Sequence, residues 1–193
     1  SEPNSFEYYR IAKCYIKINN KKLFIDFIKK SVREEPGNEK AWIFLIKYYL
    51  KNNNFRQAKY LSSKALINNH NSIKILRLNA IIHKEIGDTR EAIKFYNQIL
   101  DFKENLSWKI WKGLLKCLID NKEWSELLRT SLKAKKHYPN KAFLDFIISG
   151  CLLKNGKINE AIYFYQSGKK TCQVPEKLIK YFPEFNENKT LLV

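Results

Sequence analysis

A pattern that returns at a constant interval is the feature that most restricts how this 193-residue chain can fold. The stretch "GDTREAIKFYNQIL" at 87–100 matches, in weaker form, "NNFRQAKYLSSKAL" at 53–66, with Ala92 aligned on Ala58 and Leu100 on Leu66. A repeat of this length is typical of chains in which each unit is too small to bury its apolar face alone and must stack on its neighbours. We therefore expect a row of similar units.

The interval from Ala58 to Ala92 fits five consecutive units when one extra residue, Ser107, is placed after the third. In each unit apolar residues recur at i, i+3, i+4 and i+7, as in "WIFLIKYYL" at 42–50, which predicts amphipathic helices. Gly87 and Gly156 stand where the chain must reverse. Asn71 and Asn140 are expected to cap helices that follow them. The units are 5–38, 39–72, 73–106, 108–141 and 142–175.

The spacing of large and small residues within a unit resembles a known repeat. In the unit 39–72, Trp42, Leu45 and Tyr49 occupy positions 4, 7 and 11, while Ala58 and Ala65 occupy positions 20 and 27. This resembles the tetratricopeptide repeat, with its W-x2-L-G-x2-Y pattern followed by A-x3-F, A and P. The resemblance implies an all-α, right-handed superhelical solenoid of about five helix pairs over 5–175. The residues after it predict a capping helix at 176–183 and a tail at 184–193.

Some positions depart from that pattern. Phe24 and Leu127 stand at position 20, which is normally small, and the glycine of position 8 is missing from all five units. We therefore expect distorted helix packing in the first and fourth units. Pentatricopeptide repeats, which bind RNA one base per unit, are the nearest alternative family. The interval, which is mostly one residue shorter than in that family, and the aromatic residue at position 4 favour the tetratricopeptide repeat.

Composition narrows the possible settings of the protein. The longest nearly apolar run, 142–153, carries Asp145 and is too short to span a bilayer, so no membrane insertion is predicted. The four cysteines lack metal-ligand spacing and predict buried, reduced thiols, with Cys14, Cys117 and Cys151 at one shared repeat position. This favours a reducing intracellular compartment, first the cytoplasm and as the alternative the nucleus. A first residue other than Met is typical of a segment cut from a longer protein.

No constellation of residues predicts catalysis. The three histidines have no cysteine, serine and acidic partners at a recognisable spacing, and no glycine-rich phosphate loop is present. The sequence therefore predicts a protein that is not an enzyme and that needs no cofactor or metal.

The face expected to bind a partner follows from the resemblance, which implies that positions 2, 5, 9, 12 and 13 of each unit line a concave groove. Helical geometry places these positions along one stripe, opposite the packing residues. We call the residues at these positions the stripe; twelve of them are basic and two are acidic, within a net charge of +17. The stripe residues predicted to bind a partner are Lys13, Lys40, Lys47, Lys51, Lys74, Arg77, Lys84, Lys109, Lys112, Lys116, Phe143 and Phe146.

This distribution predicts the kind of ligand. A groove that is basic over four units and apolar in the fifth suits an acidic segment of a partner protein with a hydrophobic anchor. The two-carboxylate clamp that some tetratricopeptide proteins use for chaperones is not predicted, since only Lys74 matches its residues. The expected function is a scaffold or adaptor within a multiprotein complex. The alternative is an RNA- or ribosome-associated module that uses the same lysines for phosphates.

Overall fold

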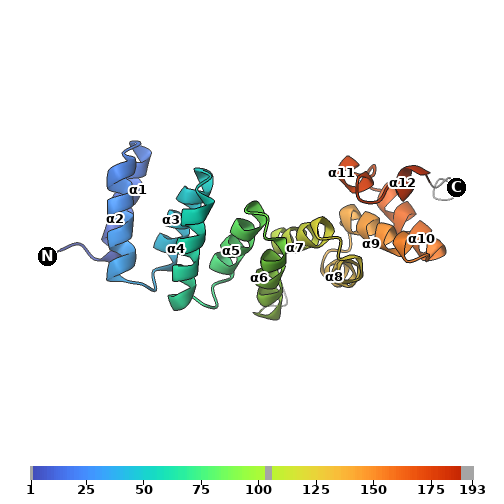
Figure 1. Ribbon diagram of the computed structural model, residues 1–193, viewed down its shortest axis with the longest axis horizontal. Helices are drawn as coiled ribbons and strands as arrows, with labels where there is room; N and C mark the ends of the chain where they lie inside the picture. The colour runs from blue at the N-terminus through green and yellow to red at the C-terminus, as the bar shows by residue number, and fades with distance from the viewer. Residues whose placement is uncertain (1, 103–105, 188–193) are drawn as a thin grey trace. The chain divides into compact units, whose positions relative to one another are not determined.

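The computed structural model describes residues 2–102 and 106–187, and every regular element within these ranges is an α-helix (Figure 1). This confirms the predicted all-α class. The chain divides into two compact units, Ser1–Glu104 and Asn105–Val193, which are described separately below as unit 1 and unit 2.

Unit 1 contains three antiparallel helix pairs in chain order. Each pair joins a helix of 13 residues to one of 14 residues through a tight turn. The helices are α1 Ser5–Lys17, α2 Lys21–Glu34, α3 Glu39–Lys51, α4 Phe55–Asn68, α5 Ile73–Glu85 and α6 Thr89–Phe102.

Unit 2 contains two further helix pairs and a C-terminal segment with two single-turn helices. The predicted capping helix at 176–183 is shorter in the structure, because the chain leaves the helix at Lys180 and Pro183 lies between the two short helices. The helices are α7 Trp108–Asp120, α8 Trp124–His137, α9 Ala142–Lys154, α10 Ile158–Lys169, α11 Glu176–Ile179 and α12 Glu184–Glu187. No helix in the described ranges has both the length and the apolar character needed to cross a membrane.

The turns within the helix pairs share one backbone feature, a residue in the left-handed conformation. The residue at position 15 of every pair has a positive φ, at Asn19, Asn53, Gly87, Lys122 and Gly156. Successive members are equally spaced along the chain, except that the step from Gly87 to Lys122 is one residue longer and accommodates Ser107. Glycine and asparagine adopt this left-handed conformation most readily, so four of the five turns carry a suited residue.

Asparagine also begins many of the helices. Asn4, Asn20, Asn38 and Asn54 are N-caps whose side chains accept a hydrogen bond from a backbone N–H in the first turn. The predicted caps Asn71 and Asn140 were each placed one residue too early. The N-cap of α5 is Ser72, and the N-cap of α9 is Lys141, which makes no side-chain capping bond.

The core of each unit lies between the two layers of helices. Small residues such as Ala58, Ala92 and Ala161 are fully buried, which allows the helices of a pair to approach closely. Phe24 and Leu127, the two large residues at position 20, are also fully buried. The Phe24 ring packs between the pairs, 5.4 Å from the ring of Phe44 and 4.7 Å from that of Tyr48, so its extra bulk fills space there.

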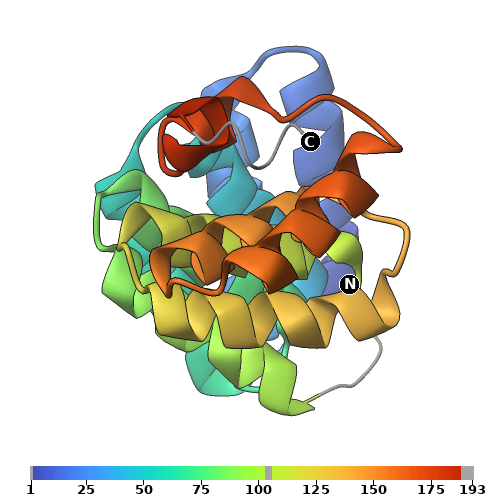
Figure 2. The same cartoon turned by 90° about the vertical axis from the view of Figure 1, so that its right-hand side faces the viewer.

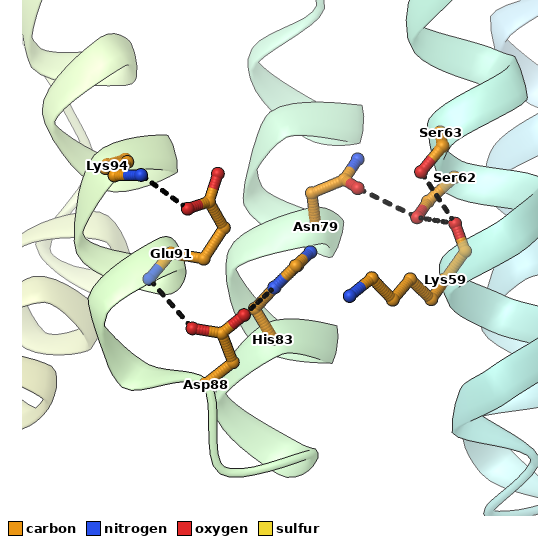
Figure 3. Close-up of polar contacts among 8 residues, drawn as sticks. All are labelled: Lys59, Ser62, Ser63, Asn79, His83, Asp88, Glu91 and Lys94. Atoms are coloured by element: carbon orange, nitrogen blue, oxygen red, sulfur yellow. Dashed lines mark hydrogen bonds and ion pairs between the residues drawn. The ribbon is translucent and has the colours of Figure 1, made fainter.

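Separate polar contacts join α4 to α5 and α5 to the turn before α6 within unit 1 (Figure 3). Buried Ser62 lies 2.8 Å from the Oδ1 atom of Asn79, and buried His83 lies 3.1 Å through Nδ1 from Asp88 Oδ2. Asp88 also caps α6 by accepting a hydrogen bond from the Glu91 backbone N–H. The bond to His83 and this backbone bond lower the pKa of Asp88 below its usual value. Ser62 and Asn79 thus supplement apolar packing between the second and third helix pairs, whereas His83 and Asp88 join α5 to the turn before α6 within the third pair.

Candidate functional site

A pocket on the stripe of unit 1 lies between α1, the start of α2, and α3. Its volume of about 480 Å³ falls in the range of ligand-binding clefts. None of its nine lining residues is acidic, whereas three are lysines. The residues that line it are Ile16, Asn19, Lys21, Phe24, Phe44, Lys47, Tyr48, Lys51 and Asn52. We call this the basic pocket.

Three predicted stripe residues meet in the basic pocket. Ile16 comes from α1, whereas Lys47 and Lys51 lie one turn apart on α3, so their ammonium groups extend from the same side of that helix. Both lysines are exposed, which lets their charges reach a ligand. The pocket thus joins residues from two successive helix pairs.

The floor of the basic pocket is aromatic, and the stripe did not predict it. Phe44 and Tyr48 are half-buried and pack on the buried Phe24 ring beneath them. The Tyr9 ring of α1 also contacts Phe44, in an edge-on arrangement with the ring centres 5.8 Å apart. Sequence reasoning missed Phe44, Tyr48 and Lys21 because they fall outside the five stripe positions. The signal that could have identified the two aromatic residues is their place on α3 next to the basic stripe positions, since Tyr48 directly follows Lys47 and Phe44 lies about one turn before Tyr48.

The remaining stripe residues of unit 1 differ in how free they are. Lys13 and Lys40 are exposed, and the Lys13 ammonium lies 5.6 Å from the Tyr9 ring centre. Lys74 is ion-paired with Glu39 at 3.2 Å. Partial burial tends to raise the pKa of Glu39, but hydrogen bonds from Ser72 and Lys74 outweigh it and the pKa is lowered. Part of the positive charge predicted for the stripe is therefore neutralised within the unit.

Arg77 and Lys84 of α5 are half-buried. The Nε atom of Arg77 is buried and has no hydrogen-bond partner within the described ranges. The guanidinium of Arg77 is thus held partly within the helix layer, and it offers less of its charge to a ligand than the exposed lysines of α3.

The stripe of unit 2 is basic on α7 and covered on α9. Lys109, Lys112 and Lys116 are exposed, as predicted. Phe143 is half-buried, with its ring 6.2 Å from that of Trp108 in an edge-on arrangement. The expectation that Phe146 is a free apolar anchor is wrong, because its ring is fully buried against Tyr165 and Phe185.

The cysteines do not share one environment. Cys117 and Cys151 are buried at position 10 of their helix pairs, and burial raises the pKa of Cys151 to about 12. A thiol with that pKa is protonated at neutral pH and unreactive. Cys14 holds the same position in the first pair but is exposed, and Cys172 is exposed as well. The prediction of buried thiols is therefore wrong for these two residues.

Comparison with known sequences relates the first helix pair to a repeat family. A family model described as tetratricopeptide repeat matches residues 8–38. A search of curated proteins by sequence found no significant match.

Comparison with solved structures extends the likeness to nearly the whole chain. A structure of the MamA protein superposes with a TM-score of 0.70 at 13% identity, covering 96% of this chain and 95% of that one. YrrB, described as "a TPR protein with an unusual peptide-binding site", gives a TM-score of 0.68 at 13% identity, covering 97% of this chain and 89% of that chain. A chain of the Naa15/Naa10 complex bound to HypK-THB gives 0.66 at 14% identity, covering 97% and 30%. At these identities the likeness establishes a shared fold.

Proposed function

We propose that this chain, which is a tetratricopeptide-repeat protein, is a non-enzymatic scaffold or adaptor that holds an acidic segment of a partner protein. The observation that carries this proposal is the basic pocket of unit 1, with three lysines around an aromatic floor and no acidic residue in its lining. The description of YrrB as a peptide-binding protein supports the ligand class by analogy.

The chemistry of the basic pocket defines the ligand more closely. Lys21, Lys47 and Lys51 would attract carboxylates, and each such exposed pair contributes only about 0–1 kcal/mol. Their sum steers association and depends on salt. Phe44 and Tyr48 would contact one apolar or aromatic side chain, which supplies the larger part of the affinity. The preferred ligand is therefore an apolar or aromatic residue flanked by Asp or Glu.

A nucleic-acid ligand is the contrasting class, since the same lysines could contact phosphates. Stacking of bases requires aromatic faces that are open to the solvent. Phe44 and Tyr48 are half-buried, and they pack against Phe24 and Tyr9. This arrangement favours a side chain that inserts into the pocket over a base that stacks flat on it.

The test begins with selection of random peptides on the immobilised chain, followed by fluorescence anisotropy of the best binder at several salt concentrations. We expect enrichment of Asp or Glu around one aromatic or large apolar residue. The double variant Lys47→Glu, Lys51→Glu should weaken binding of that peptide at least tenfold, which corresponds to about 1.4 kcal/mol or more.

The matched control is the double variant Lys22→Glu, Lys64→Glu, which changes the net charge equally at two exposed residues outside the basic pocket. It should bind the peptide within about twofold of the wild type. If both variants lost the same affinity for the peptide, the effect would come from the net charge of the chain and not from the basic pocket. Tighter binding of a single-stranded RNA oligonucleotide, abolished by the Lys47, Lys51 variant, would instead favour the nucleic-acid function.

A further inference from the structure

The C-terminal segment of unit 2 does not form another helix pair. Its side chains instead contact stripe residues of the same unit. In Figures 1 and 2 the segment with α11 and α12 lies to one side of α9 and α10. Its regular structure is limited to two helices of four residues. Nevertheless Leu178, Phe182 and Phe185 are all buried, at 2%, 0% and 5% exposure. The segment is therefore held in the manner of a bound peptide.

Gly150 of α9 provides the seat for the Phe182 ring. A Cβ atom at Gly150 would lie within 3.0 Å of three carbon atoms of that ring, so any larger residue would have to displace it. Glycine inside a helix costs about 1 kcal/mol relative to alanine. The close approach of Phe182 is the feature of this site that requires glycine.

Phe185 makes the second aromatic contact of the segment. Its partner on α9 is Phe146, which lies one helical turn before Gly150. The ring centre of Phe185 lies 6.4 Å from that of Phe146 and 5.5 Å from that of Tyr165. Phe146 is itself pressed towards Gly168 of α10, where a Cβ atom would lie 2.8 Å from the Phe146 ring. Two glycines thus make room for a cluster of edge-on and tilted aromatic rings between α9, α10 and the segment.

Polar contacts fix the direction of the segment on this surface. Lys154 donates a hydrogen bond to Glu184 at 3.2 Å, and its ammonium also lies 5.7 Å from the centre of the Phe182 ring. The Tyr181 hydroxyl donates to Asp120 Oδ1 at 2.9 Å. The contacts therefore alternate between aromatic and polar groups of the segment.

The residues that the segment contacts occupy the positions at which the repeat pattern predicts contact with a ligand. Phe146, Gly150 and Lys154 occupy stripe positions of the fifth repeat, and Asp120 occupies one of the fourth. We propose that this surface of unit 2 is a second peptide-binding site, which the segment 178–185 occupies as an intramolecular ligand. A partner segment would compete for this site if it had the same order of residues as Phe182–Phe185: an aromatic residue, any residue, an acidic residue and a second aromatic residue. This site lies in a different unit from the basic pocket and does not depend on it.

The test uses the full chain and a labelled peptide of residues 176–187, "EKLIKYFPEFNE". The double variant Phe182→Ala, Phe185→Ala should release the segment and leave Gly150 accessible. We expect it to bind the peptide at least tenfold more tightly than the wild type, in which the site is filled. A peptide with both phenylalanines changed to alanine should not bind.

Adding Gly150→Ala to the double variant should abolish binding, since the new methyl group would occupy the position of the Phe182 ring. Its matched control is Gly37→Ala in the same background, because a Cβ atom at Gly37 meets nothing within 4 Å. The control should bind like the double variant. Absence of peptide binding by the folded double variant, or binding that Gly150→Ala does not reduce, would overturn the proposal.

Hydrogen exchange of the wild-type chain supplies a test if the double variant does not fold. An exchangeable ligand should open independently, so amides of 178–185 should exchange at least tenfold faster than the most protected amides of α9. Excess free peptide should accelerate their exchange further. Exchange as slow as that of α9, unaffected by the peptide, would make the segment a permanent part of the core and contradict the proposal.

Discussion

Helix α3 of unit 1 and helix α9 of unit 2 carry stripe residues at the same repeat positions but present different surfaces. In unit 1, Lys47 and Lys51 extend from α3 over an aromatic floor and are exposed. In unit 2, Phe146 and Gly150 lie at the corresponding kind of position on α9 and are buried beneath Phe182 and Phe185. One repeat geometry therefore supports a charged, open surface on α3 and an apolar surface on α9 that the C-terminal segment covers, whereas α7 of unit 2 keeps its exposed lysines.

The largest expected effect concerns the covered surface. Phe146→Ala should lower the free energy of unfolding by about 3–5 kcal/mol, because removal of a fully buried phenylalanine leaves a cavity. Phe44→Ala, at the half-buried floor of the basic pocket, should cost only about 1–2 kcal/mol. Urea unfolding followed by circular dichroism measures both values. Similar small losses for the two variants would mean that Phe146 is as accessible as Phe44, and the contrast between the units would disappear.

A second contrast involves one ion pair from each unit. Lys135 lies 2.6 Å from Asp145, whose side chain is only 5% exposed, whereas Lys74 and Glu39 are 71% and 32% exposed. Lys135→Gln leaves the Asp145 carboxylate buried without its charge partner and should cost about 2–3 kcal/mol. Lys74→Gln should cost less than about 0.5 kcal/mol. The urea midpoints of the two variants give the comparison, and equal losses would contradict it.

The smallest expected effect is a dependence of unit 1 on pH. Because the pKa of Asp88 is lowered in the folded chain, its stabilising effect is fully present above the unfolded value of about 4 and is lost as the pH falls through the lowered value. Asp88→Asn retains a capping oxygen but removes the charge. It should cost about 0.5 kcal/mol at pH 6 and less near pH 3, below the unfolded value. Urea unfolding at both pH values tests this, and an equal cost at both would assign the effect to hydrogen bonding alone.

Sequence reasoning predicted the fold well because the repeat signal is local. The spacing of Trp42, Leu45 and Ala58 is set by the period of one helix and the closeness of its pair partner, so it can be read without knowing the rest of the chain. The turn glycines Gly87 and Gly156 likewise report a backbone conformation that is fixed at their own positions.

The candidate sites were less predictable, because they depend on contacts between distant segments. Phe146 was assigned to an open groove because nothing in α9 indicates that Phe185, which lies beyond α10 and α11 in the chain, covers it. The aromatic floor at Phe44 and Tyr48 depends on Phe24 from the preceding helix pair, which the stripe positions ignore. Exposed lysines such as Lys109 were easier to place, because a charged residue on a solvent-exposed face of a helix needs no partner.

The connection between α10 and the C-terminal segment sets how strongly a competitor would have to bind. Only residues 170–175 separate the end of α10 from the start of α11. A short tether of this kind holds its segment at an effective local concentration in the millimolar range. A free peptide of equal intrinsic affinity at micromolar concentration would therefore face a roughly thousandfold disadvantage. Displacement of the segment would thus select partners that bind much more tightly or that are already held close to unit 2 by another contact.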